Sequence, residues 1–281
     1  MGLPDVQSWK PRSSFKLTRV GIKGIKKQVY IKRPEKTVQL IVNMEVFVDL
    51  PASKKGSDLS RNSEVIEEVV EQSAREPSSS LEELCGEMAV RLLRKHEYAT
   101  RSEVHASADY FLDRLTPGKR KTMEPYRIMS DVFATSDGKI KKFIGVEVMG
   151  MTACPCAMET IREAYGKDTR MTHNQRSIST LIMESRGGVD ADDLIDIAEA
   201  SMSSPTYEIL KRSDEKDVVV QAHENPKFVE DVVRDMLANV LERYGGLPDD
   251  TEVLARNESL ESIHKHNAFA ERKTTLGELK K

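Results

Sequence analysis

The sequence predicts an α+β fold in which helices cover one face of an antiparallel sheet. Two strand-like segments, 15–33 and 38–50, follow each other across a break that contains proline. A second pair surrounds Asp137-Gly138, which is a strong signal for a two-residue hairpin turn. Helical patterns come in groups after these pairs, and grouped strands and helices favour α+β over alternating α/β architecture.

The first half of the chain predicts a hairpin, two helices and a further strand. Apolar and polar side chains alternate along the first segment, and the second is rich in β-branched residues, as in paired strands. Apolar residues then recur at helical spacing, with Cys85 inside the apolar stripe of the second helix. The predicted elements are strands at 15–33, 38–50 and 99–111, a helix capped by Asn62-Ser63, and a helix through Leu81–Leu92.

The second half predicts another hairpin followed by helices and strands. Its helix over 227–244 has a regular apolar face and ends at Gly245-Gly246, a typical helix stop. The tail 271–281 is polar, and we expect it to be frayed. The other predicted elements are strands at 126–134, 139–151, 178–185 and 251–256, a short helix after Cys156, and a helix beginning at Asp190-Ala191.

Composition excludes several classes of function. The chain has 43 basic and 46 acidic residues and a net charge of −3, so it lacks the basic excess typical of nucleic-acid-binding proteins. No apolar run approaches the ~20 residues that cross a bilayer, and the N-terminus shows no signal-peptide segment. Three cysteines cannot form a disulfide framework. We therefore expect a cytoplasmic protein without nucleic-acid or membrane partners.

Two of the three cysteines lie in the motif Cys154-Pro155-Cys156. Proline fixes its own φ and stiffens the turn, so both thiols are held in set directions. Free cysteines are often simply buried apolar side chains, and the motif alone leaves that alternative open. A four-cysteine structural zinc site needs a second pair, which the chain lacks. The motif therefore favours a catalytic metal site with mixed ligands.

Three of the six histidines strengthen this interpretation. His173 follows the Cys-Pro-Cys turn after one loop, and His264 and His266 form a late His-x-His pair. A lone histidine in a polar loop is usually solvent-exposed, but imidazoles together with the thiol of Cys154 suit Zn(II) or Fe(II). The remaining histidines, His96, His105 and His223, are predicted to be surface or sheet residues.

A basic loop is a candidate phosphate site. Lys55-Gly56-Ser57, together with Arg61, offers amide, hydroxyl and guanidinium donors, although its spacing is not that of a P-loop. Arg176 is a further cation, close to His173 in sequence. A solvated basic surface loop is the alternative for this segment.

Taken in chain order, these motifs resemble the prokaryotic type IB GTP cyclohydrolases. The resemblance covers residues 55–266, and two features are similar to the archaeal MptA branch: the run Ser57-Asp-Leu-Ser-Arg-Asn62, and the long segment from Cys156 to His173. The segments that carry the resemblance are Lys55–Asn62, Cys154–Cys156, Thr172–Ser177, Leu210–Lys216, Asn225–Asp231 and Glu261–His266.

This resemblance implies the tunnelling fold (T-fold), in which two fused sheet-plus-helix modules form one chain. The expected organisation is a single domain over residues 1–281, with internal modules at 12–118 and 119–270 and the polar tail at 271–281. Members of the family join their subunits, so we expect a homotetramer with active sites at the interfaces.

The resemblance also implies roles for individual residues. Glu261 would anchor the purine, since a carboxylate accepts two N–H bonds from guanine. Glu230 would act in acid–base catalysis, although a carboxylate at a helix start is also favoured by the helix dipole. Fe(II) is the expected metal, with Zn(II) or Mn(II) as alternatives. The implied ligands are Cys154, His173, Glu215 and His264, with His266 as an alternate; the implied catalytic residues are Cys156, Glu230 and His173; the implied substrate contacts are Glu261, Arg61, Lys55 and Arg176.

The implied reaction opens the imidazole ring of GTP at C8 and releases formate. The MptA branch forms 7,8-dihydroneopterin 2′,3′-cyclic phosphate, the first step of archaeal pterin and methanopterin synthesis. A type IB enzyme that yields dihydroneopterin triphosphate is one alternative, and a non-catalytic metal-binding T-fold protein is another. The nitrile reductases of deazapurine synthesis use a lone cysteine, so the paired cysteines and the His-x-His pair disfavour them.

Overall fold

The computed structural model describes residues 5–281, which form two compact units. Each unit takes residues from two parts of the chain. Unit 1 contains the residues up to Asp109 together with Met129–Ile144, and unit 2 contains Tyr110–Ile128 and Gly145–Lys281.

Unit 1 is built on antiparallel strands. The chain begins with a single 3₁₀ turn, η1 (Val6–Ser8). The predicted hairpin is then formed by β1 (Leu17–Lys32) and β2 (Thr37–Leu50). β2 also pairs antiparallel with β3 (Arg101–Leu115), and the order continues through parts of β4 (Lys121–Thr135) and β5 (Ile140–Ala153). Gly24 has φ +73° where the β1–β2 register shifts, a conformation that glycine adopts without strain.

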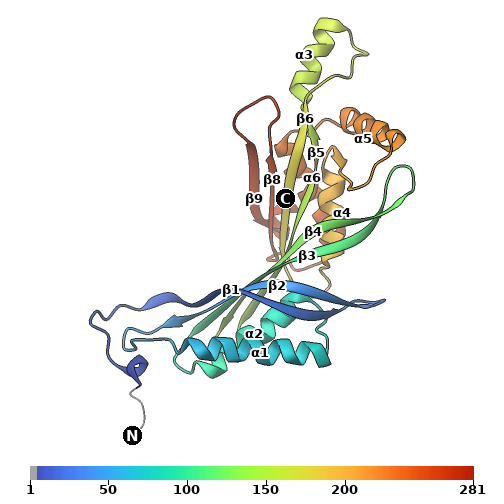
Figure 1. Ribbon diagram of the computed structural model, residues 1–281. Coiled ribbons are helices and arrows are strands. Elements are labelled where there is room, and N and C mark those ends of the chain that lie inside the picture. The colour runs from blue at the N-terminus through green and yellow to red at the C-terminus, as the bar shows by residue number, and fades with distance from the viewer. Residues whose placement is uncertain (1–4) are drawn as a thin grey trace. The chain divides into compact units, whose positions relative to one another are not determined.

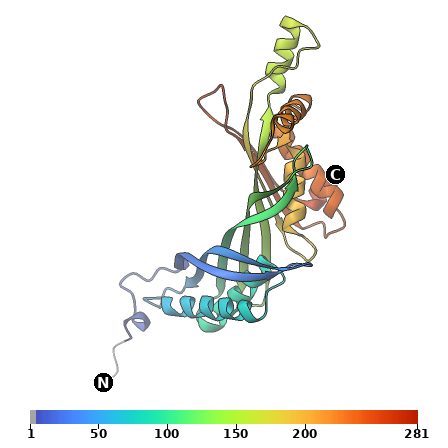
Figure 2. The same cartoon turned by 45° about the vertical axis from the view of Figure 1, so that its right-hand side comes forward.

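Two helices cover one face of the unit 1 strands (Figures 1 and 2). They are α1 (Leu59–Arg75) and α2 (Leu81–Lys95), and their apolar stripes are buried, including the predicted core residue Cys85. Burial raises the pKa of the Cys85 thiol to about 12, which keeps it protonated and unreactive. The predicted cap at Asn62-Ser63 is wrong: α1 begins at Leu59 after Asp58, which has a left-handed φ of 53°.

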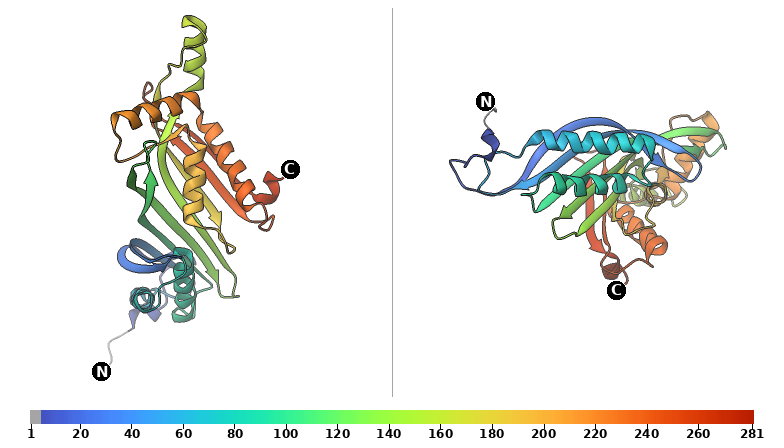
Figure 3. Two further views of the ribbon diagram at one scale, coloured as in Figure 1. Left: turned by 90° about the vertical axis from the view of Figure 1, so that its right-hand side faces the viewer. Right: turned by 90° about the horizontal axis from the view of Figure 1, so that it is seen from below.

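Unit 2 carries the rest of β3, β4 and β5, followed in order by β6 (Asn174–Glu184), β8 (Glu252–Ser259) and β9 (Ala268–Thr275). The short β7 (Ser204–Pro205) pairs with β5, and the β6–β8 and β8–β9 pairs are antiparallel. Two helices, α4 (Ala191–Ser201) and α6 (Val229–Tyr244), lie side by side on one face of these strands (Figure 3). Helix α3 (Pro155–Tyr165) projects beyond the end of β5 (Figure 1).

The structure corrects two predictions in unit 2. No helix was predicted around Glu215, but this residue lies on α5 (Arg212–Glu224), a helix whose mostly polar surface lacks a clear apolar stripe. The tail from residue 271 was expected to be frayed, yet it contains the end of β9 and the short α7 (Leu276–Leu279). β9 is rich in charged residues, so its pairing with β8 decides its conformation more than its own pattern does.

The predicted α+β class with an antiparallel sheet and covering helices is confirmed. Within residues 5–281, no helix is both long enough and apolar enough to span a bilayer.

Candidate functional site

The Cys-Pro-Cys turn lies where β5 ends and α3 begins. Pro155 is the first helical residue, a position where its missing N–H costs nothing, and Cys154 is the N-cap. The Cys154 sulfur accepts a hydrogen bond from the Ala157 N–H at 3.4 Å. The backbone N–H of Cys154 also donates to the His173 carbonyl at 3.1 Å. The fold therefore brings the two predicted ligands Cys154 and His173 together across β5 and β6.

These two residues line a cavity of about 280 Å³ in unit 2. The ends of β5, β6 and β8, the start of α6 and the segment 261–269 form its wall. The lining residues are Thr152, Cys154, His173, Gln175, Lys227, Phe228, Val229, Glu230, Ser259, Glu261, His264, His266, Ala268 and Phe269.

The cavity contains the predicted imidazoles. The ring centroids of His173 and His264 are 6.3 Å apart and nearly perpendicular, and His264 stacks on His266 at 5.1 Å. His264 and His266 are exposed, whereas the His173 side chain is 12% exposed. Across residues 5–281, no group of three or more His, Cys, Asp or Glu side chains is arranged to hold a metal ion.

Two of the predicted carboxylates also line the cavity. Glu261 is 11% exposed, and one of its carboxylate oxygens lies 4.0 Å from Nδ1 of His173. Glu230 is exposed in the first turn of α6, where the helix dipole favours negative charge. The cavity therefore holds one thiol, three imidazoles and two carboxylates.

Three predicted site residues of unit 2 are not among the lining residues. Cys156 is exposed in the first turn of α3, and Glu215 is exposed on α5. Arg176 is exposed on β6 between the buried Gln175 and Ser177, so strand alternation directs it to the opposite face.

The predicted phosphate contacts belong to unit 1. The ammonium of Lys55 lies 5.4 Å from the centroid of the Trp9 ring. Arg61 donates to the Lys95 carbonyl at 2.8 Å and lies 3.9 Å from the Asp58 carboxylate. Both cations thus have contacts within their own unit.

Sequence reasoning missed the role of His96, which was expected at the surface or in the sheet. The residue is fully buried just after α2, and its Nε2 lies 2.6 Å from Asn62 Oδ1. Its Nδ1 lies 2.9 Å from the Tyr98 hydroxyl, which donates to the Ser57 carbonyl at 2.7 Å. His96 therefore contacts the Lys55–Asn62 motif directly at Asn62 and, through the Tyr98 hydroxyl, at Ser57. Asn62 and His96 are 34 residues apart, so no local pattern signals this contact.

Burial, with a contribution from Arg61, lowers the pKa of His96 to about 4, so the ring is neutral near pH 7 and carries one hydrogen. Because the Tyr98 hydroxyl already donates to Ser57, the ring hydrogen lies on Nδ1 and Nε2 accepts. Asn62 meets this requirement when its amide is turned over, so that Nδ2 and not Oδ1 faces the ring. That orientation also gives a partner to Asn62 Nδ2, which has none when Oδ1 faces the ring.

We expect His96 to make the protein less stable in acid. In the unfolded chain the His96 ring binds a proton near pH 6.5, whereas in the folded protein it does so only near pH 4. The free energy of unfolding therefore falls as the pH drops from about 6.5 to about 4. Protonation of His96 lowers the free energy of unfolding by at most about 3 kcal/mol. Urea unfolding at pH 7.5, 6, 5 and 4 should show this additional loss in the wild type but not in His96→Gln.

His105→Gln is the matched control. The hydrogen bond that His105 donates to the Asp131 carboxylate raises the pKa of His105, so its stabilising contribution is present at low pH and fades as pH rises. The two variants should therefore change the pH dependence in opposite directions. Parallel stability curves for wild type and His96→Gln would contradict the buried neutral assignment.

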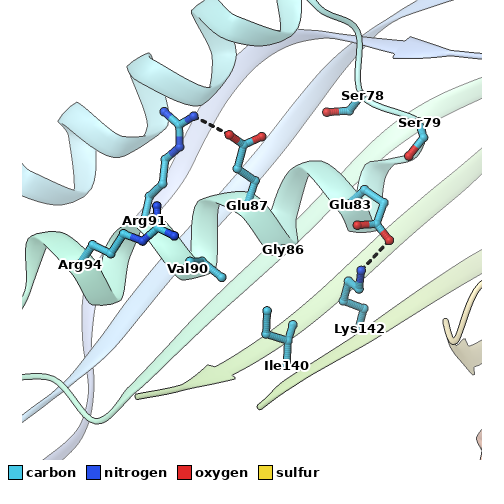
Figure 4. A pocket seen from close by; sticks show the side chains of 10 residues that line it. All are labelled: Ser78, Ser79, Glu83, Gly86, Glu87, Val90, Arg91, Arg94, Ile140 and Lys142. Atoms are coloured by element: carbon cyan, nitrogen blue, oxygen red, sulfur yellow. Dashed lines mark hydrogen bonds and ion pairs between the residues drawn. The ribbon is translucent and has the colours of Figure 1, made fainter. Parts of the chain in front are cut away.

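A second cavity, of about 570 Å³, lies beside α2 in unit 1 (Figure 4). Its charged side chains are largely neutralised within the wall, because Arg91 pairs with Glu87 and Lys142 pairs with Glu83. None of its ten lining residues is a histidine or cysteine. The unit 2 cavity is therefore the better candidate for metal-assisted chemistry.

A family model described as Type I GTP cyclohydrolase folE2 matches residues 3–270 of the chain. The chain belongs to this family. The chain is 46% identical to the GTP cyclohydrolase MptA of Methanococcoides burtonii and 42% identical to that of Methanosphaera stadtmanae. Each alignment covers 99% of this chain and 96% of the relative. The predicted membership of this enzyme family, including its MptA branch, is confirmed.

Solved structures of uricases share the fold. The uricase from Bacillus fastidious superposes with a TM-score of 0.57 over 94% of this chain and 95% of its own, at 11% identity. The uricase from Arthrobacter globiformis gives 0.53 over 92% and 93%, at 8% identity. At such low identity these likenesses concern the fold alone.

Proposed function

We propose that this protein is a metal-dependent GTP cyclohydrolase that opens the guanine imidazole ring and releases formate. The proposal rests above all on one observation: Cys154, His173, His264 and Glu261 line a single cavity, in a chain of the GTP cyclohydrolase family. Cys154 and His264, the first and last of these residues in the sequence, are 110 positions apart. The fold brings all four to the same end of unit 2.

The types of donor that line the cavity suit a divalent transition metal, although these side chains are not gathered into a ligand group in the described residues. A thiolate with imidazoles is the mixed soft and borderline set that binds Zn(II) or Fe(II), and Cys154, His173 and His264 would supply it. Glu215, which lies on α5 outside the cavity lining, is the proposed fourth ligand, and His266, which lines the cavity, is the alternate. A metal ion bound there would lower the pKa of water and so favour hydrolysis near neutral pH. We propose Fe(II), with Zn(II) or Mn(II) as alternatives.

The chain's own residues would bind and orient GTP. Glu261 would accept hydrogen bonds from the guanine N1–H and 2-amino group, and its nearly buried carboxylate suits this role. Water adds at C8 and the C8–N9 bond breaks to give a formamide, which a second water hydrolyses to formate. Glu230 would transfer protons in these steps, and Cys156 would lie beside the substrate. Lys55, Arg61 and Arg176, none of which lines the cavity, are the proposed contacts of the triphosphate.

We further propose that the ring then closes to a pterin. An attack by the 2′-hydroxyl of the neopterin side chain on the α-phosphorus, with cleavage of the bond from this phosphorus to the α,β-bridging oxygen, would give 7,8-dihydroneopterin 2′,3′-cyclic phosphate and expel pyrophosphate, as expected for a first step of methanopterin synthesis. The high identity to relatives named MptA favours this product over the triphosphate. Three free cysteines are in keeping with a reducing cytoplasm.

Anaerobic incubation with GTP and Fe(II) tests the function. Formate should appear with a fluorescent pterin after oxidation, and phosphorus NMR should show a cyclic phosphate together with pyrophosphate. A triphosphate pterin would support the cyclohydrolase but reject the proposed product. Stable metal binding without formate would instead identify a non-catalytic metal-binding protein.

We propose a T-fold with two modules and a homotetrameric assembly whose active sites lie at subunit interfaces. β1 and β9 each stand at an end of the strand order, and edge strands of this kind are normally covered in the native protein. Sedimentation at micromolar concentration should give about four times the 31.7 kDa of one chain. A fully active species at the mass of a single chain would contradict the assembly.

A further inference from the structure

The environment of His173 determines which of its ring nitrogens carries hydrogen. Three oxygen atoms surround Nδ1: Gln175 Oε1 at 2.9 Å, Ser262 Oγ at 3.4 Å and Glu261 Oε2 at 4.0 Å. An ionised carboxylate only accepts hydrogen bonds, and so does an amide oxygen. This arrangement favours a hydrogen on Nδ1 and leaves Nε2 as the nitrogen with a free lone pair.

Gln175 has a second hydrogen-bond partner on the side away from His173. Its Nε2 donates to Thr152 Oγ1 at 3.1 Å, and Thr152 Oγ1 lies 3.3 Å from Ser259 Oγ. Thr152 and Ser259 are each 1% exposed and Gln175 is 9% exposed, so water does not compete readily for these contacts. With its NH₂ group turned to Thr152, Gln175 presents its carbonyl oxygen to His173. If the amide were reversed, Nδ1 would lose its hydrogen while facing the Glu261 carboxylate.

Local structure explains why Gln175 has this position. His173 directly precedes β6, and Gln175 is the second residue of that strand. Residues two apart in extended chain point to the same side, so the amide lies beside the imidazole. Thr152 lies near the end of β5, two residues before Cys154. The C-terminal end of β5 and the N-terminal end of β6 therefore position both the proposed ligands Cys154 and His173 and the residues that orient His173.

We propose that Gln175, oriented by Thr152, is a positioning residue that keeps hydrogen on Nδ1 of His173 and presents Nε2 to the metal. The inference rests on the proposed function for the role of His173 as a ligand. Partners of this kind fix the ring orientation of metal-binding histidines, and their loss usually weakens metal binding about 10- to 100-fold.

The first test is magic-angle-spinning NMR of ¹³C,¹⁵N-histidine-labelled protein prepared without metal. Loss of one signal set in His173→Asn assigns the residue. Wild type should show His173 in the Nδ1–H form, and Gln175→Leu should shift it to a mixture or to the Nε2–H form. Thr152→Val should shift it in the same direction. Gln175→Glu keeps an acceptor at the same place and should retain the Nδ1–H form.

The second test is Zn(II) affinity, measured by competition with a chelator. We expect Gln175→Leu to lose about 10- to 100-fold and Gln175→Glu to remain near wild type. Ser177→Ala is the matched control, because Ser177 is also buried on β6 but bonds to Asn257 and not to His173. It should bind Zn(II) like the wild type.

An Nε2–H form in the wild type, or an unchanged Zn(II) affinity in a folded Gln175→Leu protein, would overturn the inference. Both measurements are made without GTP. A wild type that fails to release formate therefore counts against the proposed function, and leaves the result for Gln175 to be judged independently. Circular dichroism melting curves identify any variant that fails to fold, and Thr152→Val then provides the decisive comparison.

Discussion

Replacing Cys154 with alanine is expected to remove bound metal and GTP turnover together while the chain stays folded. Cys154 is partly exposed at the end of β5, so its thiol contributes little to the core. Its sulfur would supply the single soft ligand of the cavity. Loss of a supporting residue alone costs about 10- to 100-fold, so loss of a direct ligand should lower turnover by at least about 100-fold. Metal analysis and formate assays on the same preparation measure both effects.

Cys156→Ala is the matched control, because it removes the other thiol of the same motif. Cys156 is exposed on α3 and does not line the cavity, so metal content should stay near normal while turnover falls. A Cys154→Ala protein with full metal and full activity would refute the ligand assignment. If Cys156→Ala were the metal-free protein instead, the roles of the two cysteines would be reversed.

Most of the fold could be predicted because its elements carry strong local patterns. The β1–β2 hairpin alternates clearly, α2 and α6 have regular apolar faces, and Asp137-Gly138 marks the turn between β4 and β5. α5 and β9 were missed because their surfaces are largely polar. In both, contacts with the rest of unit 2 outweigh the intrinsic preference of the segment.

The candidate site could be predicted only in part, for a related reason. The Cys-Pro-Cys and His-x-His spacings identify chemical groups, and the fold places Cys154, His173 and His264 in one cavity. Spacing says nothing of the partners that orient these groups. The contact of His96 with Asn62 and the bond of Gln175 to Thr152 join segments distant in sequence, and both became visible only in three dimensions.

Glu261→Gln is expected to lower GTP turnover at least about tenfold without changing metal content. The substitution keeps the shape of the side chain but replaces one acceptor with a donor, which would face two donors on guanine. An unpaired buried donor costs about 1–3 kcal/mol, which corresponds to about 5- to 150-fold in rate, and the cost is larger when a charged partner is lost. The low exposure of Glu261 supports the upper part of this range. Steady-state kinetics with GTP and metal analysis measure the two quantities.

Two comparisons make the assignment of Glu261 specific. Glu258→Gln changes a carboxylate on β8 that bonds to Asn267 and does not line the cavity, so turnover should stay near wild type. ATP offers an acceptor at N1 and no 2-amino group, so the wild type should reject it for the same reason that Glu261→Gln handles GTP poorly. Normal GTP turnover by Glu261→Gln, or ring opening of ATP as fast as that of GTP, would show that another residue binds the purine. If both variants lost activity equally, the effect would come from the charge of this region and not from a specific contact with the base.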